Sequence, residues 1–61
     1  MDRSFLPGDL VRFLDYVEGA EGDGRGTVVE WADERNGILS IRLTSGDIVE
    51  VSKGLVERLD R

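Results

Sequence analysis

Short runs in which apolar and polar residues alternate recur along the chain and predict an all-β fold. In residues 38–43, leucine and isoleucine alternate with Ser40 and Arg42, so the apolar side chains share one face of an extended strand. Four other runs have the β-branched and aromatic character of strands: residues 9–14, 26–31, 47–51 and 55–59. The pattern predicts five short strands and no amphipathic helix of useful length.

Turn-forming residues separate these strands. They are Pro7-Gly8, Asn36-Gly37, Ser45-Gly46 and residues 52–54, the last predicted as a 3₁₀ turn. The Asn-Gly pair is a strong signal for a hairpin. Residues 1–6 are expected to be a lead-in, and residues 7–60 a single domain.

A flat sheet of this size would leave its apolar face in water, whereas a sheet bent and closed on itself buries that face and hides most of its edges. We therefore expect a small five-stranded barrel with one core. The expected core residues are Val11, Phe13, Val28, Leu39, Ile41, Leu43, Val49, Val51 and Val56. A single core in so short a chain supplies about 3–5 kcal/mol of net stability, so self-association or a partner would help it.

Glycine and acidic residues alternate between the first two predicted strands and indicate a long loop over residues 15–26. Its carboxylates (Asp15, Glu18, Glu21 and Asp23) could gather around a hard cation, but they lack the EF-hand spacing. A solvated loop that meets a basic protein partner is favoured. The glycine run predicts no phosphate site, because neither a Lys-Ser/Thr pair nor a helix follows it. Gly26 is expected to permit an unusual backbone conformation where the loop re-enters the sheet.

Charge and composition narrow the function. Among 61 residues, 13 are acidic and 8 are basic, which gives a net charge of −5. The absence of cysteine and histidine excludes disulfides, thiolate or imidazole metal sites, and nucleophiles paired with histidine. We expect no enzymatic activity, no cofactor and no membrane association, and a cytoplasmic location.

The order of these segments resembles the KOW motif of SH3-like barrels. A Gly-Asp-Leu-Val-Arg-Phe strand at residues 8–13 is followed by a loop and by Gly-Thr-Val-Val at residues 26–29. The resemblance covers roughly residues 7–60 and implies an SH3-like barrel with a long glycine-rich, acidic first loop. KOW domains that touch RNA carry Lys and Arg around this loop, where the present chain has carboxylates. KOW-like and Tudor-like barrels also bind proteins, which suits an acidic chain better.

The leading functional hypothesis is a non-catalytic protein-interaction module that binds a basic or extended protein segment at the rim of the barrel. The candidate partner-binding residues are Tyr16, Glu18, Glu21, Asp23, Arg25, Trp31 and Arg42. Phe13, Tyr16 and Trp31 could form an aromatic cage for a cation. One alternative is a nucleic-acid-binding accessory of the ribosome or transcription machinery that uses Arg25, Arg35, Arg42 and Arg58. Another is a homo-oligomeric structural subunit.

Overall fold

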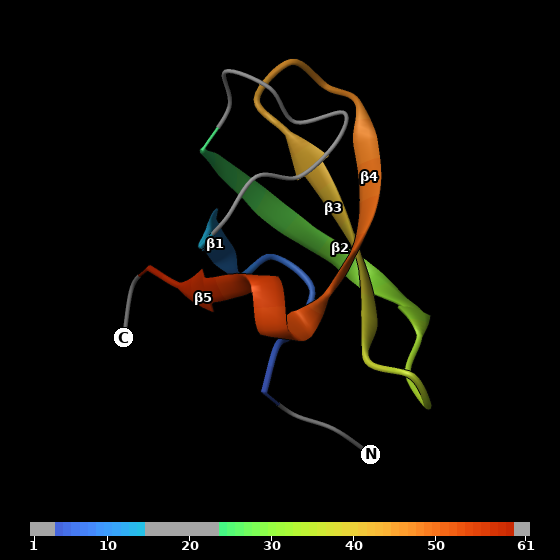
Figure 1. Cartoon of the computed structure of the whole chain (residues 1–61). Coiled ribbons are helices and arrows are strands. Elements are labelled where there is room, and N and C mark those ends of the chain that lie inside the picture. Colours follow the sequence, from blue (N-terminus) through green and yellow to red (C-terminus); the bar gives the residue numbers. More distant parts are fainter. Residues whose placement is uncertain (1–3, 15–23, 60–61) are drawn as a thin grey trace.

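A computed structural model gives the fold and describes residues 4–14 and 24–59. It contains five strands and one short 3₁₀ segment, which confirms the all-β prediction (Figure 1). In chain order the elements are β1 (Leu10–Phe13), β2 (Arg25–Asp33), β3 (Ile38–Leu43), β4 (Ile48–Ser52), η1 (Lys53–Leu55) and β5 (Val56–Arg58). Every predicted strand is present, β3 with the predicted ends and the other four with ends that differ by one or two residues.

The strands form one antiparallel sheet in the order β4-β3-β2-β1-β5. The nine-residue β2 is the longest strand and contains two register shifts against β3, between Val28 and Glu30 and between Trp31 and Asp33. Such irregularities bend a strand and increase its twist. Within the described residues no backbone pairing joins β4 to β5, so these two strands are the edges of the sheet.

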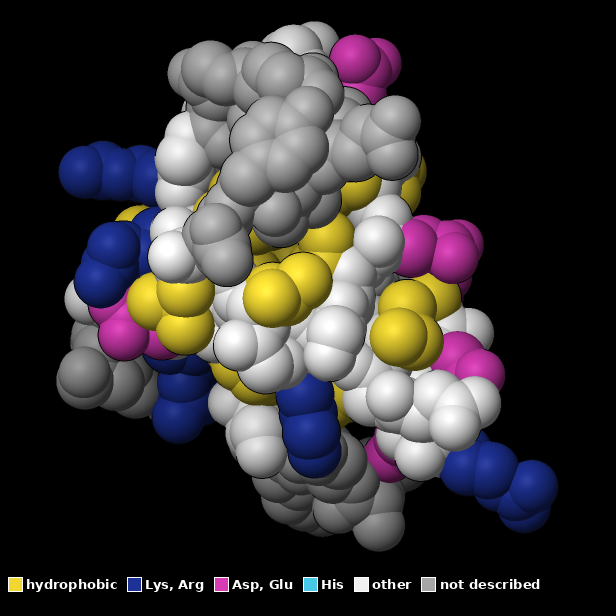
Figure 2. Space-filling view, viewed as in Figure 1, with side chains coloured by type: hydrophobic (Ala, Val, Ile, Leu, Met, Phe, Trp, Pro, Cys, Tyr) yellow, Lys and Arg dark blue, Asp and Glu magenta, His cyan; other side chains and the backbone are white. Residues whose placement is uncertain are grey.

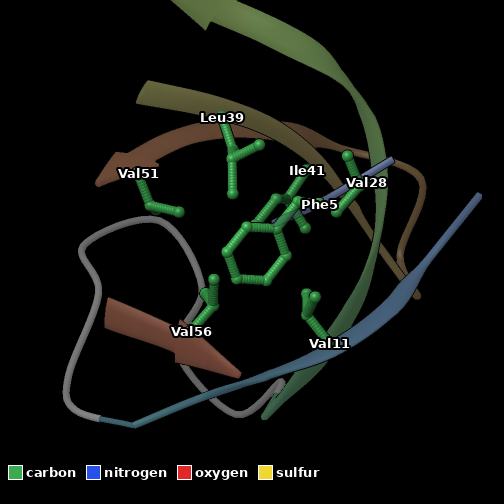
Figure 3. Packing of buried hydrophobic residues seen from close by; sticks show 7 residues of the cluster. All are labelled: Phe5, Val11, Val28, Leu39, Ile41, Val51 and Val56. Atoms are coloured by element: carbon green, nitrogen blue, oxygen red, sulfur yellow. The ribbon is translucent and has the colours of Figure 1, made fainter. Parts of the chain in front are cut away.

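The core lies against one face of this bent sheet. Its buried cluster consists of Phe5, Val11, Val28, Leu39, Ile41, Val51 and Val56, whose side chains point into the same space between the strands (Figure 3). Leu43 is also buried, while Phe13 and Val49 are only partly buried and pack against the cluster. The predicted core is therefore confirmed, apart from those two positions at its margin.

Phe5 is a core residue that the alternating pattern does not reveal. It is 8% exposed, although it lies in the segment expected to be a lead-in. Its ring meets the Trp31 ring edge-on, with centroids 6.4 Å apart and an interplanar angle of 70°. The N-terminal segment thus closes one side of the core.

The turn at Pro7-Gly8 attaches this segment to the sheet. The Asp9 amide donates to the Leu6 carbonyl at 3.0 Å, and Gly8 has a φ of 93°, which fits proline and glycine at the centre of a type II turn. Gly8 donates to the Val28 carbonyl at 2.8 Å, and the Val28 amide donates to the Asp9 carbonyl at 2.9 Å. Gly8 and Asp9 therefore extend the backbone pairing with β2 beyond the start of β1.

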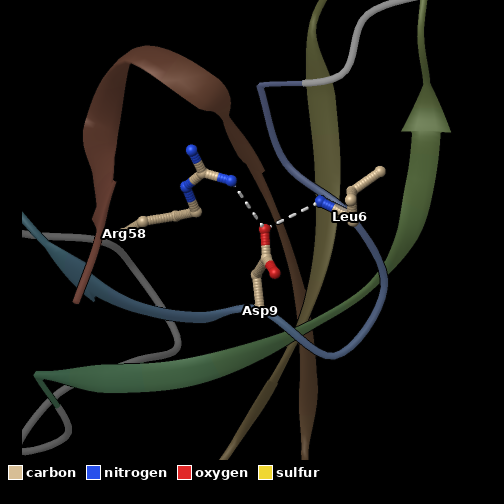
Figure 4. A network of polar contacts seen from close by, with 3 residues as sticks. All are labelled: Leu6, Asp9 and Arg58. Atoms are coloured by element: carbon tan, nitrogen blue, oxygen red, sulfur yellow. Dashed lines mark hydrogen bonds and ion pairs between the residues drawn. The ribbon is translucent and has the colours of Figure 1, made fainter. Parts of the chain in front are cut away.

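The buried carboxylate of Asp9 stabilises the same turn through hydrogen bonds. Asp9 is 8% exposed, and its Oδ2 accepts from the Leu6 amide at 3.0 Å and from the Arg58 guanidinium at 3.4 Å (Figure 4). A buried carboxylate needs such partners, because an unpaired one would cost several kcal/mol. Asp9 thereby links the N-terminal segment to β5.

The predicted hairpin joins β2 to β3 through residues 34–37. Gly37 has a φ of 71°, and no other residue of this turn has a positive φ, so the connection is not the two-residue type I′ turn. The Asp33 carboxylate accepts from the Asn36 amide side chain at 2.8 Å and from the Asn36 backbone at 3.3 Å. These hydrogen bonds, the side-chain bond foremost, hold the pKa of the exposed Asp33 carboxyl below its ordinary value.

Gly26 is required for a reason other than the expected one. Its φ is not positive, so it does not supply an unusual backbone conformation. A Cβ placed there would overlap the Ile41 side chain and lie 2.9 Å from the Arg42 carbonyl oxygen. Gly26 therefore allows β2 and β3 to lie close together.

Candidate binding groove

One cross-strand row of side chains runs over the face of the sheet that is turned away from the core. Residues directly opposite each other in antiparallel strands project to the same face. Leu10 pairs with Thr27, Thr27 pairs with Arg42, and Arg42 pairs with Ile48. The Leu59 amide extends the row beyond Leu10, because it donates to the Leu10 carbonyl at 3.0 Å. Since the neighbouring Val11, Val28 and Ile41 are buried, this row faces outward.

A groove of about 250 Å³ lies along part of this row and is named the outer groove. Its lining residues are Leu10, Arg25, Gly26, Thr27, Arg42, Leu43, Thr44 and Leu59. Leu10 is 49% exposed and Leu59 is 38% exposed, and both are among the larger exposed hydrophobic residues of the described chain. Single exposed leucines are ordinary, but Leu10 and Leu59 lie side by side at one end of the groove and form an apolar patch there.

The outer groove is also locally basic. Arg25 and Arg42 line it and are exposed, and none of its lining residues in the described part of the chain is acidic. Arg12 lies opposite Arg25 in the sheet and forms an ion pair with Glu57 on the neighbouring strand. Figure 2 shows several Lys and Arg side chains along the left side of the molecule, with hydrophobic and acidic side chains beside them.

Arg42 is the most available cation of the groove. Its side chain forms no hydrogen bond or ion pair with any other residue in the part of the chain that the structure describes. Its cross-strand neighbours, Thr27 and Ile48, are uncharged. In a chain with more acidic than basic residues, an arginine without a carboxylate partner is left able to bind an external anion.

The structure brings together some of the predicted site residues and separates another. Arg25 and Arg42 meet in the outer groove. Trp31 lies opposite the buried Leu39 and contacts Phe5, so it belongs to the core side of the sheet. The other four predicted residues (Tyr16, Glu18, Glu21 and Asp23) lie outside the described residues, and so do the proposed cation site and part of the proposed aromatic cage.

The remaining predicted arginines do not extend the groove. Arg58 binds the buried Asp9, and Arg35 lies in the turn between β2 and β3. Sequence reasoning missed Leu10, Thr27 and Leu59 as lining residues. Leu10 and Arg12 could be assigned to one face of a strand, but only the register of three pairings places Leu59, Leu10, Thr27 and Arg42 in one row.

The described residues offer no group of three or more Asp and Glu side chains placed to hold a metal ion. None of the helical segments in residues 4–14 and 24–59 is long and apolar enough to cross a membrane. Comparison with protein-family models, with curated proteins and with solved structures finds no match to this chain.

Proposed function

We propose that the chain is a small SH3-like barrel of the KOW type that serves as a non-catalytic protein-interaction module. Three features support the fold: the first four strands form a meander, a 3₁₀ segment follows β4, and β5 returns to pair with β1. A sheet that closes on itself needs its last strand to return in this way, and the bends in β2 help it to curve.

The outer groove carries the functional proposal. It combines exposed aliphatic surface at Leu10 and Leu59 with the arginines Arg25 and Arg42. Buried apolar anchors bordered by polar groups are typical of the centres of protein interfaces, where arginine is enriched. A groove of this size accommodates one or two side chains of an extended segment rather than a whole folded domain.

The absence of catalysis is part of the same proposal. The chain has no histidine or cysteine, and the described residues that line the outer groove include no carboxylate that could act as a general base. The groove therefore offers contacts and charge. Its described lining residues offer no group for proton transfer at neutral pH.

The test is a selection of short random peptides on the folded protein, followed by amide NMR of the complexes. Bound peptides should shift the amide signals of Leu10, Thr27 and Arg42. Replacing Leu10 by serine should weaken binding about tenfold, because an exposed apolar contact is lost. Leu6→Ser is the matched control, since Leu6 is 44% exposed and does not line the groove. Selected peptides whose binding is unaffected by Leu10→Ser would contradict the proposal.

Nucleic-acid binding is the second candidate, and the pair Arg25 and Arg42 is the observation that favours it. Phosphate contacts release counterions, so such binding must weaken steeply as the salt concentration rises. Titration with a mixed-sequence single-stranded RNA at low salt tests it. Shifts confined to residues around the arginines, which reverse with added salt, would favour RNA over a protein segment.

A further inference from the structure

The two ends of the outer groove differ in chemical character, and this difference indicates what kind of segment it binds. Its apolar end is formed by Leu10 and Leu59, on the β1–β5 side, and Arg42 lies two strands away on β3. Thr27 lies between them on β2 and adds no charge. A ligand that fills the groove therefore meets aliphatic carbon on the β1–β5 side and the Arg42 guanidinium on β3, with Arg25 lining the same groove from β2.

We propose that the outer groove binds an extended protein segment in which a large aliphatic side chain is followed or preceded, two residues away, by Asp or Glu. This inference rests on the proposed function. It replaces the basic segment expected from the acidic loop with an acidic one, because Arg25 and Arg42 line the groove and none of its described lining residues carries a carboxylate. A carboxylate accepts paired hydrogen bonds from an arginine, which fixes both its distance and its orientation.

The two-residue spacing between the aliphatic and the acidic residue of the bound segment follows from strand geometry. Neighbouring strands lie about 4.8 Å apart, so Leu10 and Arg42 are separated by about 10 Å across β2. Two side chains on the same face of an extended segment are about 6.7 Å apart. The long side chain of Arg42 covers the remaining distance of about 3 Å. An aliphatic residue and an acidic residue two positions apart can therefore contact both ends of the groove at once.

Charge and surface chemistry favour a protein segment over a nucleic acid. The chain carries a net charge of −5, which repels a polyphosphate, whereas one or two carboxylates meet only the local field of Arg25 and Arg42. Single-stranded nucleic acids also bind by stacking their bases on aromatic side chains. None of the described residues that line the outer groove is aromatic, and Trp31 faces the core side of the sheet.

The experiment repeats the random-peptide selection on the wild-type chain and on the variant Arg42→Gln. Wild-type protein should enrich peptides with Leu, Ile or Val two positions from Asp or Glu. Synthetic copies of these peptides should bind Arg42→Gln about tenfold more weakly, and copies with Gln in place of the acid should lose the same factor on wild type. On Arg42→Gln, the Gln substitution in the peptide should have little further effect, because its partner is already gone.

Arg35→Gln is the matched control, because Arg35 is also exposed but lies in the turn between β2 and β3. It should bind the selected peptides as wild type does. Enrichment of basic or neutral peptides, or equal loss with Arg35→Gln and Arg42→Gln, would overturn the inference while the proposed interaction function remained. Failure to enrich any peptide would overturn both, as would RNA binding in its place or sedimentation showing that the face is covered by a second copy.

Discussion

Gly26 sets how closely β2 can approach β3. The nearest atoms to a Cβ at this position would be the branched end of Ile41, which is fully buried, and the Arg42 carbonyl oxygen, which belongs to a strand backbone. Neither can move aside without disturbing the core or the β2–β3 pairing. The constraint at this position is therefore steric, and it applies to every residue larger than glycine.

We predict that Gly26→Ala lowers the free energy of unfolding by about 1–3 kcal/mol, the usual range for forcing extra atoms into a packed site. Urea denaturation followed by tryptophan fluorescence measures it. Gly24→Ala is the control, because a Cβ at Gly24 would have no neighbour within 4 Å and its φ is not positive. Equal stabilities for the two variants would show that β2 and β3 do not approach as closely as described.

Asp9 illustrates how a charged side chain can be needed inside a small domain. Its Oδ2 accepts from both Leu6 and Arg58, which are distant from each other in sequence. We predict that Asp9→Ala costs about 2 kcal/mol of stability, because the Leu6 amide and the Arg58 guanidinium both lose their acceptor. Asp9→Asn should cost less, since its amide oxygen can still accept from Leu6. Thermal unfolding of the two variants gives the comparison, and a larger loss for Asp9→Asn would contradict this account.

These residues also mark the limit of sequence reasoning at this scale. Alternation correctly identified Leu39 and Ile41 as core residues, because each lies in a strand with a clear period of two. It could not identify Asp9 as buried, because the partner that makes burial tolerable lies 49 positions away, at Arg58. When the partners of a residue lie far away in the sequence, the residues next to it in the chain do not indicate whether it is buried.

The elements themselves follow closely from their own sequences. β3 has the predicted bounds, because its alternation is regular and turns flank it on both sides. β2 extends further than predicted, to Asp33, because pairing with β3 continues through the register shifts. The polar residues at its end belong to the strand only because Ile38 pairs with Asp33. Pairing thus determines where a strand ends when composition gives no clear boundary.

The hairpin between β2 and β3 should make stability depend on pH through Asp33. Its hydrogen bonds from Asn36 lower the folded-state pKa below the value of 3.8 expected for an unpaired carboxyl. A carboxyl with a depressed folded pKa contributes stability above the unfolded-state pKa, and this contribution is lost as the pH falls through the folded-state pKa. Asp33→Ala should therefore lower the melting temperature near pH 6, and this difference should shrink below pH 3.8.

Thermal unfolding of wild type and Asp33→Ala between pH 6 and the acid limit of reversibility measures this difference. Asp47→Ala is a useful control. Asp47 is also exposed, but the two hydrogen bonds from Asn36 that hold the hairpin are accepted by Asp33 and not by Asp47. A melting-temperature difference for Asp33→Ala that stays constant across the range would mean that the ionised carboxylate does not hold the turn.

At the scale of the whole molecule, the sheet alone does not complete the core. The strands supply most of the buried cluster, but Phe5 reaches it from the segment before Pro7 and also contacts Trp31. The sequence could not reveal this, because residues 1–6 have no period that assigns a face. The outer groove was equally hidden, since its residues come from β1, β2, β3 and the residues directly after β3 and β5. Both features arise from the assembly of elements rather than from any one of them.

We therefore predict that Phe5→Ala unfolds the domain or nearly so. Removing a buried phenylalanine costs about 3–5 kcal/mol, which equals the total that one core of this size supplies. Urea denaturation should show a midpoint near zero, and the amide NMR spectrum should lose its dispersion. Leu6→Ala is the control, because the neighbouring Leu6 side chain is 44% exposed and should tolerate truncation with a loss below about 1 kcal/mol.

The result for Phe5→Ala would also show whether the outer groove depends on the N-terminal segment. Asp9 ties the N-terminal segment to Arg58 on β5, and the next residue, Leu59, forms one wall of the outer groove. If Phe5→Ala remains folded, the sheet is stable without the N-terminal segment, and Leu59 should keep its place beside Leu10. If it unfolds, and a bound peptide restores the dispersed spectrum, binding and folding are linked, because a ligand that binds only the folded state stabilises it. The marginal stability of the core and the binding of a peptide in the outer groove would then be coupled in one equilibrium.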